Sequence, residues 1–193
     1  MLSLRESIEW LEREFPPNPP RFRLHEELPF AILRYAPEDE WQLRQEARHL
    51  ATRIEGAGLG VVRASLADLM WRAIDRTEGL AAIVELEQHL GFGAAQEQVG
   101  LYLSDPDFSP LADMLAALLS GHDPSRHVCF LMRSGALGPN IYRVSSLLEE
   151  MHGRTQVPTV LFYPGESNGS DELLFMGLAS RDTPRNYRVK VYG

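Results

Sequence analysis

Two nearly continuous apolar runs constrain the fold of this chain most strongly. They are RHVCFLM at residues 126–132 and VPTVLFYPG at residues 157–165, and such runs are typical of strands whose two faces are both covered by helices. The stretch between them carries apolar residues at helical spacing, namely Ile141, Val144, Leu147, Leu148 and Met151. A strand, a helix and a second strand in this order predict a βαβ crossover, which is expected to be right-handed.

The chain before these runs repeats the alternation of strands and helices. PFAILRY at 29–35 predicts a strand, residues 37–56 follow a helical period, and LGVVRASL at 59–66 predicts another strand. Ser65 and Asp68 have the spacing of a capping box, so a further helix is expected to begin there.

The tail supplies two more strand candidates, ELLFMGL at 172–178 and NYRVKVY at 186–192. The predicted fold class is therefore α/β, a three-layer sandwich with a mostly parallel central sheet and a C-terminal edge that is open to antiparallel pairing. This architecture is P-loop-NTPase-like or Rossmann-like.

The first segment of the chain is amphipathic and separable. Its apolar residues lie at helical spacing, namely Leu4, Ile8, Leu11 and Phe15. A proline-rich run follows at 16–20 and ends the helix. We expect an N-terminal helix and linker at 1–20 and a single α/β domain at 21–193 with a helical insertion at about 79–120. The helix packs either on its own domain or on a partner, and the first arrangement is the more common.

Charge and composition narrow the class of protein. The formal net charge is −8 and the pI is about 5.3, so most of the surface repels nucleic-acid phosphates. The N-terminus has charges throughout and resembles neither a signal peptide nor a membrane span. The single cysteine, Cys129, lies in an apolar run and is expected to be buried and inert. These features predict one soluble cytoplasmic domain.

The motifs of common enzymes are missing from the sequence. There is no glycine-rich turn with Gly-Lys-Ser or Gly-Lys-Thr and no GxGxxG, so ATP hydrolysis is not expected. The six histidines lack the spacing of metal ligands, and the serines lack a GxSxG context. We therefore expect no catalytic residue, cofactor or metal ion.

Two loops at the carboxyl ends of strands are candidate contact sites, because open α/β sheets bind ligands there. The loop at 134–140 contains Gly135, Gly138 and Asn140, and the loop at 162–170 contains Gly165 and Glu166. The structural alternatives are a tight turn, with Pro139 starting the next helix, and a hairpin connection.

The charge balance reverses only near the C-terminus. The candidate contact residues there are Arg181, Arg185, Asn186, Tyr187 and Arg188. Such a patch suits an acidic partner or nucleic acid, whereas charged residues also protect the exposed edge strands of sheets.

Several segments together resemble the BrxB family, small components of the BREX bacteriophage-exclusion systems. They are ELPFAILRYAPEDEWQLRQEARHL at 27–50, VPTVLFYPG at 157–165, LLFMGL at 173–178 and NYRVKVY at 186–192. The resemblance implies a role in phage defence beside a large ATPase, a DNA methyltransferase and an alkaline-phosphatase-like protein, and it carries no catalytic residues.

Three hypotheses follow. The first is a non-enzymatic assembly module that contacts the larger defence proteins through the C-terminal edge and the two loops. The alternative is a degenerate ATPase-like protein of the same system that binds nucleotide or DNA, and the third is a hydrolase whose acids come together only in the fold.

Overall fold

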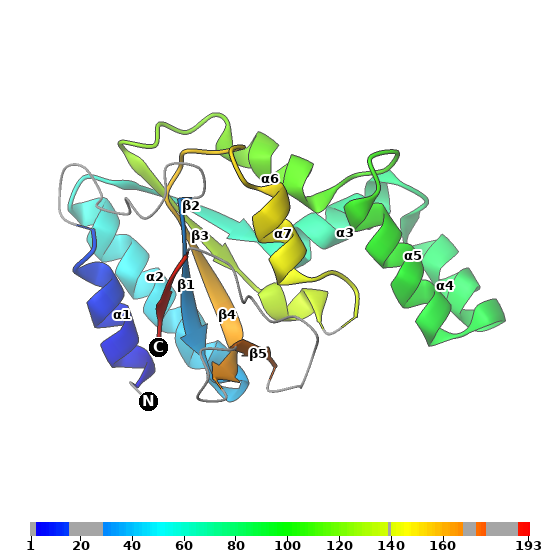
Figure 1. Cartoon of the computed structure of the whole chain (residues 1–193), viewed down its shortest axis with the longest axis horizontal. Helices are drawn as coiled ribbons and strands as arrows, with labels where there is room; N and C mark the ends of the chain where they lie inside the picture. Colours follow the sequence, from blue (N-terminus) through cyan, green and yellow to red (C-terminus); the bar gives the residue numbers. More distant parts are fainter. Residues whose placement is uncertain (1–2, 16–28, 139, 168–172, 177–188) are drawn as a thin grey trace.

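The computed structural model describes residues 3–15, 29–138, 140–167, 173–176 and 189–193. Across these ranges, five parallel strands form the central sheet in the order β2-β3-β4-β1-β6 (Figure 1). The strands are β1 (Phe30–Tyr35), β2 (Gly60–Ser65), β3 (His127–Met132), β4 (Thr159–Ser167) and β6 (Lys190–Tyr192). The predicted three-layer α/β sandwich with a mostly parallel sheet is confirmed.

One face of the sheet is covered by α1 (Leu4–Glu12) and α2 (Glu40–Gly56), and a 3-10 turn, η1 (Pro37–Asp39), precedes α2. Side chains of β1 alternate between the faces, as the pleat requires. Leu33 packs with the core under α1 and α2, whereas Ile32 packs with the core on the other side. Both faces are buried, which explains why the strand sequences are almost continuously apolar.

The opposite face is covered by α3 (Leu66–Arg76), α6 (Leu111–Leu119) and α7 (Val144–Glu150). The connection from β1 to β2 runs toward the β2 edge of the sheet and carries α2 on the first face. The connections from β2 to β3 and from β3 to β4 run in the opposite direction, toward the β6 edge, and carry their helices on the second face. Opposite directions on opposite faces give all three crossovers the same hand.

The segment predicted as a helical insertion, at about 79–120, contains three helices, and the last of them, α6, covers the sheet. The other two, α4 (Gly79–Leu90) and α5 (Phe92–Ser104), are joined by the single residue Gly91. We call residues 79–104 the α4–α5 hairpin. Gly91 has a φ of +88°, which favours glycine, so the chain reverses there at little cost. Figure 1 shows the hairpin extending away from the sheet, at the opposite end of the molecule from α1.

The N-terminal helix packs on its own chain. Its apolar residues Leu4, Ile8, Leu11 and Phe15 belong to the core between α2 and the sheet. Nε and Nη2 of Arg53 in α2 bind the two carboxylate oxygens of Glu12 at 2.7 and 2.8 Å. Lys190 of β6 binds Glu14 at 2.5 Å. The helix is therefore anchored to both α2 and the edge strand.

Two details differ from the sequence predictions. The edge strand β6 pairs parallel with β1, and the antiparallel pair instead joins β4 to the short β5 (Leu173–Phe175). Helix α7 begins at Val144 and not near Pro139, because Arg143 has extended backbone angles and the amide of Tyr142 donates to the carbonyl of Leu137. Among the residues described, no helix combines the length and apolarity needed to cross a membrane.

Candidate functional site

The two loops predicted as contact sites meet at the carboxyl edge of the sheet. After β3, residues Ser134–Leu137 form a 3-10 helix, η2, and Oγ of Ser134 donates a 2.7 Å hydrogen bond to the carbonyl of Phe162 in β4. A Cβ added at Gly135 would lie 3.7 Å from Sδ of Met176, just after β5. The segments at 134–140 and 162–170 are therefore neighbours in space. The prediction of a loop from Phe162 was wrong, because strand β4 continues to Ser167.

Gly138 has a packing role in this arrangement. Its φ of −87° is ordinary, so no special backbone angle is needed. A Cβ at this position would lie 2.3 Å from Cε1 of Phe175, whose ring is buried against Tyr163. Gly138 thus makes room for β5, whereas the neighbouring Asn140 is exposed.

The basic C-terminal candidates Arg181, Arg185, Asn186, Tyr187 and Arg188 lie outside the described residues, and so does the side chain of Glu166.

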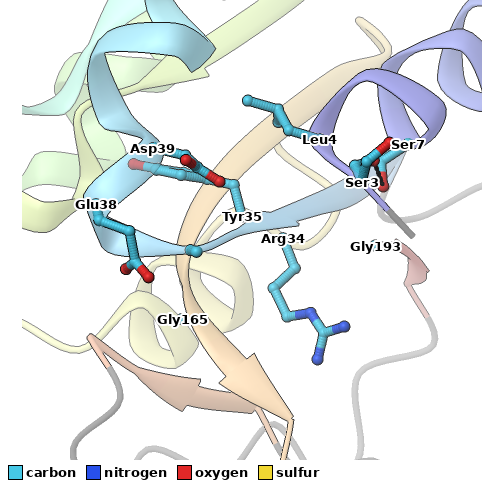
Figure 2. A pocket seen from close by; sticks show the side chains of 10 residues that line it. Ser3, Leu4, Ser7, Arg34, Tyr35, Glu38, Asp39, Gly165 and Gly193 are labelled. Atoms are coloured by element: carbon cyan, nitrogen blue, oxygen red, sulfur yellow. Dashed lines mark hydrogen bonds between the residues drawn. The ribbon is translucent and has the colours of Figure 1, made fainter. Parts of the chain in front are cut away.

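Gly165 of β4, by contrast, lines a pocket that the sequence did not reveal. The pocket has a volume of about 200 Å³, and Figure 2 shows it at the carboxyl ends of β1 and β4. Its lining comes from α1, β1, η1, β4 and the C-terminus, namely Ser3, Leu4, Ser7, Arg34, Tyr35, Ala36, Glu38, Asp39, Gly165 and Gly193. β1 leads to a helix on one face and β3 to helices on the other. The carboxyl ends of parallel strands are where open α/β sheets bind ligands.

Arg34 is the unusual residue in this pocket. It is the only charged residue of β1, and it is 9% exposed. Its side chain forms no hydrogen bond or ion pair with any residue in the described part of the chain. Figure 2 shows it extending from the end of β1 between Gly165 and Gly193.

Tyr35, the last residue of β1, also lines the pocket. Its hydroxyl donates to a carboxylate oxygen of Glu40, and the other oxygen of Glu40 accepts a 2.7 Å hydrogen bond from Nε of Arg44. Burial, and then the hydrogen bond to Glu40, raises the pKa of Tyr35 well above its usual range. The phenol therefore stays protonated and serves as a fixed wall of the pocket.

A second distinctive surface is the α4–α5 hairpin. Of α4, only Ile83 is buried. At the tip, Leu90 is 71% exposed and Phe92 is 64% exposed. Leu80, Val84 and Leu101 are also exposed. Groups of large apolar side chains on a surface are typical of interaction sites.

The base of this hairpin is well anchored, so its exposure is not a sign of loose packing. Tyr102 of α5 is fully buried, and its hydroxyl donates to the carboxylate of Glu78. The rings of Tyr102 and Phe108 meet edge to face, with centroids 5.2 Å apart. The hairpin therefore presents its apolar tip from a fixed base.

The charged residues of the segment that contains the hairpin have one sign. Residues 77–125 contain eight of the 27 acidic residues and none of the 19 lysines and arginines. The remainder of the chain is therefore balanced, and this segment accounts for the whole formal net charge of −8. An apolar tip on an acidic stem is complementary to an apolar groove with basic residues around it.

Groups that commonly carry catalysis are not assembled in the described ranges. No three or more His, Cys, Asp or Glu residues there are placed to hold a metal ion. Burial raises the pKa of the Cys129 thiol to about 12, which makes it a poor nucleophile.

Comparison with known proteins places the chain in a family. Residues 62–191 match the family model described as BREX protein BrxB, which is about two thirds of the chain. The chain belongs to the BrxB family. It is therefore a component of the BREX phage-defence systems. Comparison with curated proteins and with solved structures gives no match.

The BrxB match contains the segments at 157–165, 173–178 and 186–192 on which the resemblance rests, while the segment at 27–50 precedes it. It also spans the α4–α5 hairpin. Arg34 and the residues of η1 lie before the matched region.

Proposed function

We propose that this BREX component is a non-enzymatic interaction module of the cytoplasm, and that it docks onto a larger protein of the same system through the α4–α5 hairpin. The partners expected from the family are the large ATPase, the DNA methyltransferase and the alkaline-phosphatase-like protein. The observation that carries the proposal is the fixed, apolar and acidic hairpin at 79–104.

The apolar side chains supply the attractive part of the contact. Leu90 and Phe92 flank Gly91 at the tip, and burying each of them on a partner would remove a large apolar surface from water. Interface energy is concentrated in such central anchors. The tip therefore suits a hydrophobic pocket of the partner.

The acidic residues supply the specificity. Glu85, Glu87 and Glu97 lie on the same two helices, and residues 77–125 contain no cation to neutralise them. Charges at the rim of an interface mainly steer association and reject partners of like charge. The partner surface is therefore expected to be basic around an apolar groove, and binding is expected to weaken as salt rises.

Co-purification tests the proposal. The chain carries an affinity tag and is co-expressed with each of the three larger BREX proteins and with all three together. We expect at least one of them to co-purify in a fixed stoichiometry. If the chain remains free in every combination, the interaction role is wrong.

A hairpin variant then tests the surface. Leu90→Ser combined with Phe92→Ser removes the tip, and the loss of two anchors of about 2 kcal/mol each corresponds to at least a 100-fold weaker complex. The matched control is Trp41→Ser, because Trp41 is 74% exposed on α2, far from the hairpin. Retained binding in the tip variant would assign the interface to another surface.

A further inference from the structure

The pocket at the carboxyl ends of β1 and β4 is separate from the hairpin and has its own chemistry. It lies beside α1 and β6, whereas the hairpin projects from the opposite end of the molecule. An inference about it therefore goes beyond the interaction role and stands on different residues.

Arg34 indicates what the pocket binds. Arg34 is the one charged residue of an otherwise apolar strand and is 9% exposed overall. Its guanidinium nitrogens keep some access to solvent, because none of them is among the fully buried unpaired side-chain atoms of the described residues. Arg34 lines the pocket and has no hydrogen bond or ion pair within the described residues, so its guanidinium can donate to a ligand there. A planar carboxylate or phosphate oxygen pair matches the fork of these donors.

The other possible source of positive charge is already used. The first turn of α1 also lines the pocket, but Glu6 accepts hydrogen bonds from the backbone amide and the hydroxyl of Ser3, at 2.8 and 2.7 Å. These hydrogen bonds lower the pKa of Glu6, so its carboxylate stays at the positive helix end. Among the described residues that line the pocket, Arg34 is thus the cation that is left for an external anion.

The opposite wall is acidic. Glu38 is exposed and Asp39 is half-buried, and both lie in η1 directly after β1. A phosphate-binding loop would occupy this position in a P-loop protein. In Figure 2 the carboxylate of Glu38 and the guanidinium of Arg34 lie on either side of Gly165. These carboxylates repel a polyphosphate and accept hydrogen bonds from hydroxyl or ammonium groups.

We propose that this pocket binds a small molecule with one oxyanion group, held by Arg34, and with hydroxyl or ammonium donors directed at Glu38 and Asp39. The volume of about 200 Å³ is below that of sites for drug-sized ligands. Two sources supply this chemistry. Free α-amino acids, with ammonium donors, are small enough for the pocket, whereas cyclic mononucleotides, with a ribose hydroxyl and a single negative charge, would place only the phosphate and ribose in it and leave the base outside.

Calorimetry and thermal shift on the full chain test the proposal with defined probes. These are the twenty standard α-amino acids, cyclic AMP, cyclic GMP and, as a polyanion, ATP. We expect at least one singly charged oxyanion to bind with one-to-one stoichiometry, and ATP to bind more weakly than that ligand. Which class binds identifies the source. Binding by no singly charged probe, or tighter binding by ATP, overturns the proposal.

Variants locate the binding. Arg34→Met keeps the length of the side chain and removes the charge, so the affinity is expected to fall at least tenfold while the melting temperature of the free protein is maintained or rises. The matched control is Arg72→Met, which removes an exposed arginine of α3 and should change affinity less than twofold.

Gly165→Val provides a second route if the arginine variant does not fold. Gly165 lies in strand β4, whose extended backbone suits a β-branched residue, and valine adds volume to the pocket lining. Binding is expected to be lost. Unchanged affinity in both pocket variants would place the ligand elsewhere and overturn the proposal, whereas co-purification with BREX partners would be unaffected by either result.

Discussion

The α1–α2 layer and the α4–α5 hairpin are two helix pairs of the same chain with opposite relations to the core. Helix α1 buries Leu4, Ser7, Ile8 and Leu11 among its nine residues. Helix α4 is the more apolar of the two in sequence, yet it buries only Ile83 among its twelve. The difference lies in where the chain places each helix, since α1 lies on the sheet and α4 lies beyond it.

This contrast shows which apolar residues the fold itself needs. Apolar residues next to the sheet stabilise the domain, because burial removes them from water in the monomer. The exposed apolar residues of the hairpin contribute little to monomer stability and remain available to a partner. The comparison therefore separates residues that maintain the fold from residues proposed to maintain the assembly.

The largest expected effect is a difference between two phenylalanines. Phe162 of β4 is fully buried and meets the ring of Phe130 edge to face, with centroids 5.4 Å apart. Phe162→Ala is expected to lower the free energy of unfolding by about 3–5 kcal/mol, through lost burial and the cavity left behind. Phe92→Ala, on the exposed tip, is expected to change it by less than about 0.5 kcal/mol. Urea denaturation measures both, and a comparable loss for Phe92 would show that the hairpin tip belongs to the core.

A second pair of variants compares two glycines at the carboxyl edge. A Cβ at Gly138 would meet the ring of Phe175 at 2.3 Å, whereas at Gly135 the nearest atoms lie at an ordinary 3.7 Å. Gly138→Ala is therefore expected to cost about 1–3 kcal/mol, as overpacking of a filled site does. Gly135→Ala should be close to neutral. Equal costs in thermal unfolding would contradict the packing role of Gly138.

The sequence predicted the body of the fold well, because its signals are local. The apolar runs at 126–132 and 157–165 correspond to β3 and β4, and the helical period of α1 was correct. The direction of β6 was not predictable, since pairing with β1 depends on residues more than 150 positions apart. The role of Gly138 likewise depends on Phe175, a distant neighbour.

The candidate sites were harder to predict from the sequence than the fold was. One signal for the pocket was present, since Arg34 interrupts the apolar run FAILRY at 30–35. Its significance required the sheet order, which brings Gly165 and Gly193 to the end of β1. The hairpin was predicted as helical, but helical spacing does not tell whether an apolar side chain meets the core or solvent.

The burial of the Cys129 thiol in the sheet predicts that the free energy of unfolding depends on pH. Burial raises the pKa of the Cys129 thiol from an ordinary value of 9.0 to about 12. Above pH 9 the unfolded chain loses this proton and the folded chain keeps it, so stability is fully present below pH 9 and declines as pH rises toward 12. Relative to Cys129→Ala, the wild type is expected to lose about 1.4 kcal/mol between pH 8 and pH 10. Parallel profiles for the two proteins in urea denaturation would mean that the thiol is hydrated in the fold.

The smallest expected effect concerns the acidic residues of the two helix pairs. Glu12 of α1 accepts two hydrogen bonds from Arg53 of α2, but both side chains are partly exposed. Glu12→Gln is therefore expected to cost about 0.2–1 kcal/mol at low salt and less at high salt. Glu97 of the hairpin has no ion pair in the described part of the chain and lies in an entirely acidic segment. Glu97→Gln should accordingly be neutral or slightly stabilising. Urea denaturation of both variants at low and high salt tests these expectations. A loss of stability in Glu97→Gln that disappears at high salt would reveal a cationic neighbour of Glu97 and weaken the case for a basic partner.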